Sequence, residues 1–252
     1  MDPLAFYPIV ARDLDLQNPM PASRLDDLAR ACGVRDGMRV LDVGSGKGSL
    51  LRRWAARFDI VATGLELNPR FAADARERAE REGVAQRLTV IEGPAADFVP
   101  AGHGYDVVAC IGAPFAIGGF DDALAWMQAA LRTGGSLVIG DRYLAEPFAP
   151  GSTGIEPEVA ALRDLGSLHE TIERAGLGVT AFFGSSTQEL DRYASAWWTA
   201  AAAWAAEHPD HPERAALLAD IAAKRGRYLD HERRHVGWGV WVTRSGAALP
   251  SG

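Results

Sequence analysis

Three glycines alternate within residues 42–48, DVGSGKG, where an apolar run gives way to a helical pattern. Alternating glycines at such a junction leave bare main chain, which another molecule can approach closely. Glu66 ends the next apolar run and supplies a carboxylate, a strong acceptor of hydrogen bonds. The two features together predict a binding site where these apolar runs end.

Two phosphate-binding motifs compete for the glycine segment. A P-loop needs a glycine five residues before its Gly-Lys pair and a hydroxyl residue after it, but Leu41 and Gly48 occupy those positions. The dinucleotide fingerprint needs its third glycine one position later, where Ser49 stands. The P-loop therefore fails at two positions. The dinucleotide motif fails at one, so an NAD-dependent oxidoreductase stays open as an alternative.

The segment resembles the D/E-x-G-x-G-x-G loop of class I S-adenosylmethionine-dependent methyltransferases, with a match at every required position. The resemblance implies a Rossmann-like fold, S-adenosylmethionine as the cofactor, and a loop that leaves room for its methionine part. Glu66 would then accept both ribose hydroxyls, and Leu67 would contact adenine. The resemblance implies these cofactor-binding residues: Asp42, Gly44, Ser45, Gly46, Gly48, Glu66, Leu67, Ala95, Ala96, Cys110 and Gly112.

The adenine end of this site departs from the family pattern. The family places an acid after the third strand, where this chain has Pro94. Adenine would be held either through the backbone of Ala95 and Ala96 or by Asp97 after a local shift. Within the loop, we expect Asp42 to accept hydrogen bonds from loop amides and Lys47 to face solvent.

The elements that must position these residues follow from periodicity. Apolar runs alternate with helical patterns up to about residue 141, which predicts an α/β fold with a mostly parallel sheet. The seven expected strands cover residues 38–43, 60–65, 88–91, 105–111, 136–140, 179–184 and 238–243. The last two would form an antiparallel edge. We therefore predict a Rossmann-like seven-stranded sheet with helices on both faces and a helical cover.

The resemblance covers nearly the whole chain. Residues 17–19, 118–120, 190–193 and 237–240 are similar to features of a bacterial subgroup of small-molecule methyltransferases. We predict one methyltransferase domain over residues 1–252. Its parts would be an N-terminal helical segment (1–35), a cofactor-binding core (36–141), an insertion and helical cover around an acceptor pocket (142–236), and the last strand (237–244).

Composition narrows the partners. The 252 residues carry 26 Lys and Arg against 33 Asp and Glu, a net charge of −7, which gives no basic footprint for nucleic acid. Cys32 and Cys110 form no C-x-x-C motif, so no thiolate metal site is predicted. With neither a secretory signal nor about 18 uninterrupted apolar residues, we expect a cytoplasmic monomer or homodimer without membrane contact.

The expected reaction is methyl transfer to an oxygen, nitrogen, sulfur or carbon of a small molecule. Residues 111–115, IGAPF, lack the Asn/Asp-Pro-Pro-Tyr turn of the methyltransferases that act on amino groups of nucleic acid or on protein glutamine. They also lack the acidic metal ligand of metal-dependent catechol-type methyltransferases, so neither class is expected. Since a sulfonium methyl is already activated, proximity and exclusion of water would do most of the work. A binding protein that keeps the loop but transfers nothing is the second alternative.

Candidate acceptor-site residues come from segments expected near the carboxyl edge of the sheet, where open α/β sheets bind ligands. The catalytic candidates are Asp141, Tyr143 and His235. The substrate candidates are Tyr7, Asn18, Arg142, Trp197 and Trp238. His208 and His211 resemble a metal-binding tract, but we expect them in an exposed loop between two helices.

Overall fold

The computed structural model describes residues 1–100, 104–149 and 151–246. The chain divides into two compact units. The sheet unit comprises Pro21–Asp141, Gly166–Gly184 and the described residues from Gly239 onward. The helical unit comprises Met1–Met20, Arg142–Leu165 and Ser185–Trp238. The single-domain organisation expected from the sequence stays a prediction.

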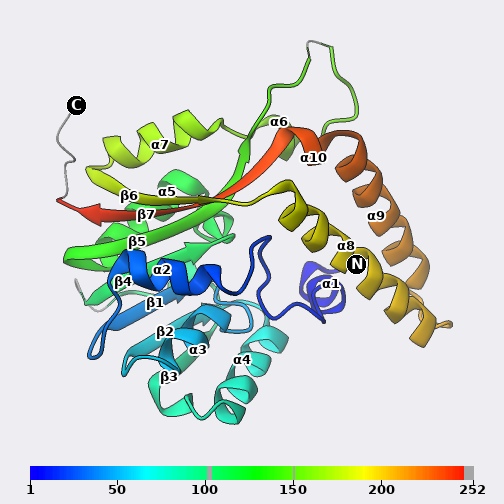
Figure 1. The fold of residues 1–252 in the computed structure, drawn as a ribbon. Helices are drawn as coiled ribbons and strands as arrows, with labels where there is room; N and C mark the ends of the chain where they lie inside the picture. The colour runs from blue at the N-terminus through cyan, green and yellow to red at the C-terminus, as the bar shows by residue number, and fades with distance from the viewer. Residues whose placement is uncertain (101–103, 150, 247–252) are drawn as a thin grey trace. The chain divides into compact units, whose positions relative to one another are not determined.

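Seven strands form one sheet in the order β3-β2-β1-β4-β5-β7-β6 (Figure 1). The strands are β1 (Arg39–Val43), β2 (Val61–Glu66), β3 (Leu88–Glu92), β4 (Tyr105–Ile111), β5 (Leu131–Leu144), β6 (Leu177–Gly184) and β7 (Val236–Ser245). Parallel pairing joins β1 to β2 and β4, β2 to β3, and β4 to β5, whereas β6 and β7 are antiparallel. The predicted fold class and its antiparallel edge are confirmed.

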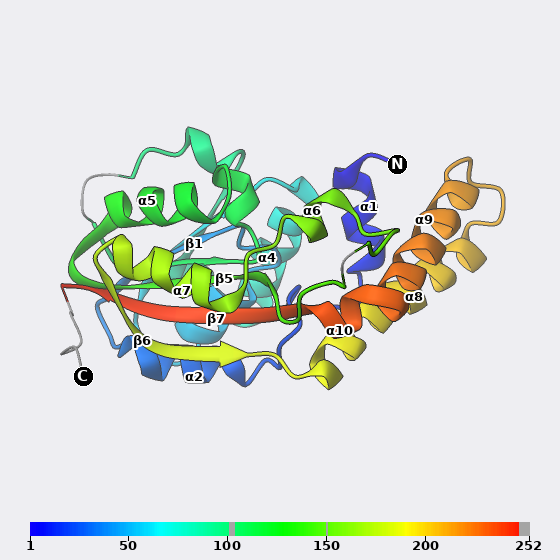
Figure 2. The ribbon, with the colours of Figure 1, turned by 90° about the horizontal axis from the view of Figure 1, so that it is seen from above.

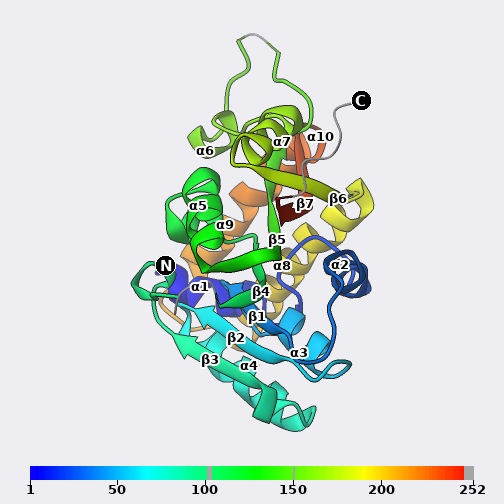
Figure 3. The same ribbon diagram turned by 90° about the vertical axis from the view of Figure 1, so that its left-hand side faces the viewer.

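The strand register brings the predicted site residues to one edge of the sheet. Val43 is aligned with Leu65 of β2 and with Cys110 of β4, so the segments that follow these strands emerge side by side. Figure 3 shows the parallel strands from β3 to β5 in succession. β4 is almost entirely buried, as expected for an apolar central strand covered on both faces.

One strand differs clearly from expectation. β5 begins at Leu131 and continues to Leu144, whereas the sequence predicts a strand over 136–140 only. Asp141, Arg142 and Tyr143 therefore lie within the strand and not after it. Beyond these residues, Leu144 forms a bridge with Asp164, and its amide donates to the Arg163 carbonyl at 2.8 Å, a contact that local composition does not reveal.

Helices cover both faces of the sheet unit, and Figure 2 shows α5 and α2 on opposite sides of the strands. Trp54 of α3 is fully buried, and its indole N–H donates to the Leu25 carbonyl of α2 at 2.7 Å. Asn68 caps the N-terminus of α4, since its side chain accepts from the Arg70 amide. The helices are α2 (Arg24–Cys32), α3 (Ser49–Ala55), α4 (Pro69–Arg81), α5 (Phe120–Ala130) and α7 (Leu165–Arg174), with short 3-10 turns η1 (Ala85–Arg87), η2 (Ala95–Asp97) and η3 (Pro114–Ile117).

The helical unit packs around two long helices. α8 and α9 lie side by side (Figure 1), and α8 begins with a capping box formed by Ser186 and Glu189. The elements are α1 (Pro3–Val10), α6 (Pro157–Ala160), α8 (Thr187–Glu207), α9 (Arg214–Arg227), the π-helix η4 (Tyr228–Glu232) and α10 (Arg233–His235). The buried core comprises Phe6, Ile9, Val10, Ala201, Leu217 and Ile221.

Two contacts fasten the N-terminal segment to α8 within the helical unit. The Arg12 guanidinium forms a bidentate ion pair with Glu207, with N–O distances of 2.7 and 2.9 Å. At the other end of the segment, the Tyr193 hydroxyl donates to the Gln17 carbonyl at 3.0 Å. His208 and His211 lie exposed between α8 and α9, as predicted.

Among residues 1–100, 104–149 and 151–246, none of the helices combines the length and the apolar character that crossing a bilayer requires.

Candidate cofactor site and acceptor residues

The glycine segment after β1 takes a backbone path that favours glycine. Gly44, Gly46 and Gly48 have φ values of 67°, 56° and 72°, all in the left-handed region. Residues with a Cβ pay a steric penalty there, and glycine does not. The alternation seen in the sequence therefore reflects three separate conformational requirements.

Two of these glycines also lack room for a side chain. A Cβ on Gly44 would lie 2.3 Å from the Ala113 Cβ, in the segment after β4. A Cβ on Gly48 would lie 3.2 Å from the Ala75 Cβ of α4. The loop is wedged between two neighbouring segments, which fixes its main chain in place.

The amides of the loop find acceptors that the sequence does not predict. Ser45 N–H donates to the Leu65 carbonyl at 2.9 Å, and Gly48 N–H donates to the Ser45 carbonyl at 2.8 Å. The Gly46 amide donates to Glu66 Oε2 at 2.7 Å. The expectation that Asp42 accepts the loop amides is therefore wrong for these three, because two of them donate to main-chain carbonyls and the third donates to the carboxylate at the end of β2.

Glu66 links the end of β2 to two segments of main chain. Its other oxygen, Oε1, accepts from the Asn68 amide at 2.7 Å, and the residue is only 7% exposed. Burial raises the pKa of Glu66, and the amides of Asn68, Gly46 and Leu67 oppose that rise. A carboxylate has about four lone-pair sites, so these three amides leave capacity for a ribose hydroxyl, the group that the family resemblance assigns to Glu66.

Asp42 lies in the core below the loop, where it is 5% exposed. Burial, and secondly the charge of Glu66, raises the pKa of Asp42 to about 8. Its carboxyl therefore holds a proton in the folded chain at pH values where an ordinary aspartate is ionised.

This raised pKa predicts a pH-dependent stability. Between the ordinary value of 3.8 and about 8, the folded state keeps a proton that the unfolded state releases. The free energy of unfolding should therefore fall as pH rises, by up to about 1.4 kcal/mol per pH unit from this group. Urea denaturation across this range should show the fall in the native chain and a smaller fall in Asp42→Asn. Identical profiles for the two proteins would contradict the assignment.

Lys47 corrects a second expectation. The sequence predicts a solvent-facing side chain, but Lys47 is 2% exposed. Its ammonium lies 5.8 Å from the centre of the Phe71 ring of α4, within cation–π range. The side chain is buried against α4. A single lysine between two glycines gives no sign of this burial in the sequence.

The other predicted cofactor residues surround the same edge of the sheet unit. Leu67 is 51% exposed, so its side chain is available to contact a ligand. Ala95 is buried and Ala96 exposed within η2, while Gly112 follows β4 with a φ of 80°. The Cys110 side chain is fully buried, and burial raises the pKa of its thiol. Their individual contacts with a cofactor stay predictions.

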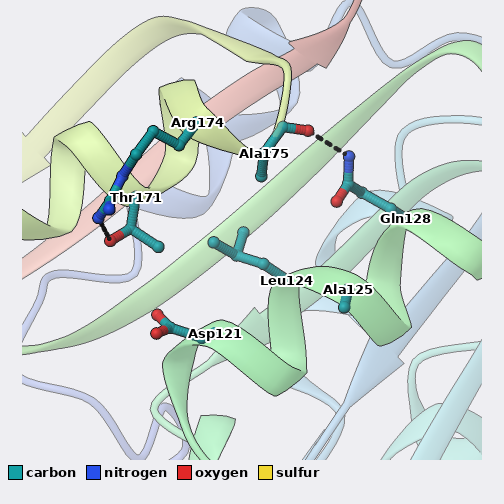
Figure 4. A pocket seen from close by; sticks show the side chains of 7 residues that line it. All are labelled: Asp121, Leu124, Ala125, Gln128, Thr171, Arg174 and Ala175. Carbon is teal, nitrogen blue, oxygen red and sulfur yellow. Dashed lines mark hydrogen bonds between the residues drawn. The ribbon is translucent and has the colours of Figure 1, made fainter.

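The sheet unit also has a surface groove of about 320 Å³ between α5 and α7 (Figure 4). Gln128 donates its side-chain amide to the Ala175 carbonyl at 2.9 Å, and Arg174 donates to the Thr171 hydroxyl at 3.1 Å. The residues that line the groove belong to α5, to α7 and to the residue after α7, and not to the ends of β1, β2 and β4. The groove therefore carries none of the predicted cofactor residues.

Two substrate candidates meet in the helical unit. The Tyr7 ring of α1 lies 5.7 Å from Trp197 of α8, edge to face. Tyr193 lies 5.6 Å from the same indole. Tyr7 is 44% exposed. Tyr193 is more deeply placed, and its burial raises the pKa of its hydroxyl. These three rings, Tyr7, Tyr193 and Trp197, are called the aromatic cluster below. The Gln17 carbonyl accepts from the Tyr193 hydroxyl, and Asn18 is the next residue in the chain.

The remaining candidates are distributed between the units. Asp141 closes the sheet-unit part of β5, and Arg142 opens the helical-unit part. Arg142 lies near both Tyr193 and Glu232. Burial raises the pKa of each of these two groups, and the positive charge of Arg142 opposes that rise. The structure therefore brings Arg142 close to the aromatic cluster, while Asp141 belongs to the other unit.

His235 has a defined orientation within the helical unit. Its Nδ1 lies 2.9 Å from the Glu146 carbonyl, and its ring lies 4.4 Å from Phe148. Because a carbonyl only accepts, Nδ1 carries the proton in this contact and Nε2 is left as the basic nitrogen. A general base at Nε2 is thus compatible with the geometry, and the catalytic role stays a prediction.

Tyr143 packs directly over Gly237 of β7. A Cβ at Gly237 would lie 2.3 Å from the Tyr143 Cζ and 2.7 Å from its hydroxyl oxygen. Burial raises the pKa of Tyr143, so its hydroxyl stays protonated at neutral pH. In that state the side chain can donate a hydrogen bond but is a poor base.

Gly237→Ala should displace the Tyr143 ring and lower the free energy of unfolding by about 1–3 kcal/mol, because overpacking forces side chains off their rotamers. Gly226→Ala in α9 is the matched control, since a Cβ there would meet nothing within 4 Å. Urea midpoints of the two variants and the native chain test this. A Gly237→Ala midpoint equal to that of the native chain would show that Tyr143 is not held over this glycine.

Comparison with known proteins identifies the family. A model of the methyltransferase domain matches residues 40–135. An uncharacterized protein of Escherichia coli, YjhP, is 31% identical over 245 residues, which cover 96% of this chain and 98% of the relative. The crystal structure of an S-adenosylmethionine-dependent methyltransferase from Geobacter sulfurreducens with S-adenosyl-L-homocysteine matches at 30% identity and a TM-score of 0.86, covering 95% and 97% of the two chains. The chain is an S-adenosylmethionine-dependent methyltransferase.

A second relative extends the comparison within the methyltransferases. The erythromycin 3''-O-methyltransferase of Saccharopolyspora erythraea is 35% identical over 144 residues. This match covers 57% of the present methyltransferase and 46% of the relative. The oxidoreductase alternative is set aside, since the structures matched over nearly the full length include two S-adenosylmethionine-dependent methyltransferases in complex with S-adenosyl-L-homocysteine.

The sheet unit of this methyltransferase fits the family's cofactor, S-adenosylmethionine. Gly44 has no room for a Cβ, so the loop presents bare main chain. Glu66 is buried beside it and retains lone pairs for hydroxyl groups. The loop and Glu66 are the groups that would hold the cofactor, which supplies an activated methyl group when bound.

Sequence reasoning missed several polar contacts of the methyltransferase. Tyr193 belongs to an apolar stripe of α8, yet its hydroxyl bonds to Gln17, 176 residues away. Asp191 accepts from the Tyr228 hydroxyl at 2.8 Å and forms a bidentate ion pair with Arg233. A tyrosine among the apolar residues of α8 was the sequence signal for such a contact, because the hydroxyl of a buried tyrosine usually has a hydrogen-bond partner.

Proposed function

We propose that this methyltransferase transfers the methyl group of S-adenosylmethionine to an oxygen, nitrogen, sulfur or carbon nucleophile of a small molecule. The aromatic cluster of the helical unit is the observation that carries the proposal. Ligand sites for small molecules are mostly apolar and aromatic, with a few placed polar groups. Tyr7, Tyr193 and Trp197 supply the rings, and Arg142, Asn18 and the Gln17 carbonyl supply polar groups around them.

The reaction asks for positioning more than for acid–base chemistry. Holding a nucleophile close to an activated methyl group with water excluded supplies much of the rate enhancement. In this proposal the aromatic cluster orients the acceptor and removes water from it. His235 Nε2 takes a proton where the nucleophile carries one, and Tyr143 donates a hydrogen bond. Asp141 is the alternative base, at the end of the sheet-unit part of β5.

Oxygen acceptors are the first class to test, because the similar Saccharopolyspora erythraea protein is an erythromycin 3''-O-methyltransferase. The test supplies S-adenosylmethionine carrying an isotopically labelled methyl group to pools of small-molecule alcohols, phenols, amines and thiols. We expect one pool to gain label, detected as a mass shift.

Trp197→Ala should lower this incorporation while cofactor affinity, measured by calorimetry, stays unchanged, because Trp197 belongs to the helical unit. Ala223→Ser on the exposed face of α9 is the control. Label found in protein or nucleic acid, or equal turnover by Trp197→Ala and the control, would contradict the proposal.

A further inference from the structure

Among the described residues, four buried side-chain donors of the helical unit lack a hydrogen-bond partner: Ser185 Oγ, Trp197 Nε1, Arg227 Nε and the Trp238 indole Nε1. Two of them, Ser185 Oγ and Trp238 Nε1, belong to residues that face each other across a strand pair. Trp238 is 6% exposed, so water does not reach its N–H freely. More than about 90% of buried polar groups in native proteins form hydrogen bonds, and an unmet donor therefore indicates a ligand or a water at that place.

Ser185 and Trp238 lie opposite each other where β6 ends. The antiparallel pairing of β6 and β7 aligns Gly184 with Gly239, and the Ser185 amide then donates to the Trp238 carbonyl at 2.9 Å. Ser185 and Trp238 are thus the next opposed pair. Opposed residues of antiparallel strands project to the same face, with Cβ atoms about 4.5–5.5 Å apart. Their side chains therefore lie on the same face of the strand pair.

Tyr143 does not occupy this place. Successive residues of a strand point to opposite faces, so Gly237 and Trp238 present different sides of β7. The Tyr143 ring lies against the Gly237 side, within 2.3 Å of where a Cβ would be. The face of Ser185 and Trp238 is therefore separate from the one that Tyr143 covers.

The chemistry of the pair selects an oxygen. An indole N–H donates only, and a serine hydroxyl donates one hydrogen bond while its oxygen can also accept. A carbonyl or carboxylate oxygen has two lone pairs and can accept from both donors. A group that only donates would leave the indole N–H unpaired, and sites built on buried donors discriminate strongly against such ligands.

We propose that Ser185 and Trp238 form a two-donor site for a carbonyl or carboxylate oxygen of the methyl acceptor. The inference rests on the proposed function for the identity of its ligand. It assigns the acceptor a chemical class: a small molecule that carries such an oxygen in addition to its nucleophile. The site binds and orients that molecule and takes no part in proton transfer.

The test follows the indole N–H signals of ¹⁵N-labelled protein, which contains seven tryptophans. Trp238→Phe assigns the signal of interest by its disappearance. The probes are benzoate and acetophenone, which offer the oxygen, and benzylamine, which matches them in size but only donates at neutral pH. We expect benzoate or acetophenone to move the Trp238 signal downfield saturably, and benzylamine to leave it in place.

Ser185→Ala should weaken the effective probe about 3–10-fold, the usual contribution of one hydrogen bond. Ser195→Ala is the matched control, because the Ser195 hydroxyl already donates to the Asp191 carbonyl within α8 at 2.8 Å. Preserved signals from the other tryptophans show that each variant folds. No shift with either oxygen probe up to its solubility limit, an equal shift with benzylamine, or equal weakening by both serine variants would overturn the two-donor site.

Labelled methyl turnover on the same variants separates this inference from the proposed function. If small molecules are methylated but neither oxygen probe reaches Trp238, the two-donor site is wrong and the proposed function stands. If the oxygen probes bind as expected but no small-molecule pool accepts a methyl group, the site stands and the proposed function is wrong.

Discussion

Gly44→Ala is expected to abolish measurable binding of S-adenosylmethionine and to lower the free energy of unfolding by about 2–4 kcal/mol. Two penalties add. A φ of 67° places the new Cβ in the left-handed region, and that Cβ lies 2.3 Å from the Ala113 Cβ. The loop or the segment after β4 must shift, and either movement displaces the main chain that holds the cofactor. Calorimetric titration and urea denaturation measure the two effects.

Two further variants separate the penalties. Gly37→Ala has a similar φ of 80° but meets nothing within 4 Å, so it reports the conformational cost alone, about 1–2 kcal/mol. The double variant Gly44→Ala with Ala113→Gly removes the steric clash and should recover stability to nearly the Gly37→Ala level. Cofactor affinity in Gly44→Ala equal to that of the native chain would mean that this loop does not hold the cofactor.

The strands and the glycine loop were predictable because each is a local pattern. β4 is apolar except for Asp106, and a nearly continuous apolar run is typical of a central strand that is buried on both faces. The left-handed glycines of the loop were visible as their alternation in the sequence. The cap at Asn68 and Pro69 is equally local, since both residues act within one helical turn.

The contacts that sequence reasoning missed are long-range. β5 extends to Leu144, whose amide donates to the Arg163 carbonyl. The buried Lys47 ammonium lies over the Phe71 ring of α4. The partner of the Gly46 amide is Glu66 and not Asp42. This pairing depends on how the side chains of two adjacent strands are placed. Ser185 and Trp238 become neighbours only through strand pairing. None of these contacts has a local periodicity that could reveal it.

Glu66→Ala is the second large expected effect, and it acts on the folded chain and on the cofactor together. The substitution leaves the amides of Gly46 and Asn68 without their acceptor in a site that is 7% exposed. Two unmet buried donors should lower the free energy of unfolding by about 2–4 kcal/mol. The ribose hydroxyls would lose their acceptor as well, and cofactor affinity should fall by about 1–3 kcal/mol, or roughly 5–150-fold.

Glu92→Ala supplies the control for Glu66→Ala, because Glu92 is aligned with Glu66 in the β2–β3 register and has the same charge. It is exposed and lies 3.6 Å from Arg76, so its loss should change stability by less than about 0.5 kcal/mol. Glu66→Gln keeps one oxygen and should fall between the native chain and Glu66→Ala in both measurements. Glu66→Ala also removes the acceptor of two main-chain amides, so the assignment to ribose depends on a comparison of ligands. S-adenosylhomocysteine and its 2'-deoxy analogue should bind Glu66→Ala with equal affinity but the native chain with different affinities. The same preference for the ribose hydroxyl in both proteins would assign that recognition to another residue.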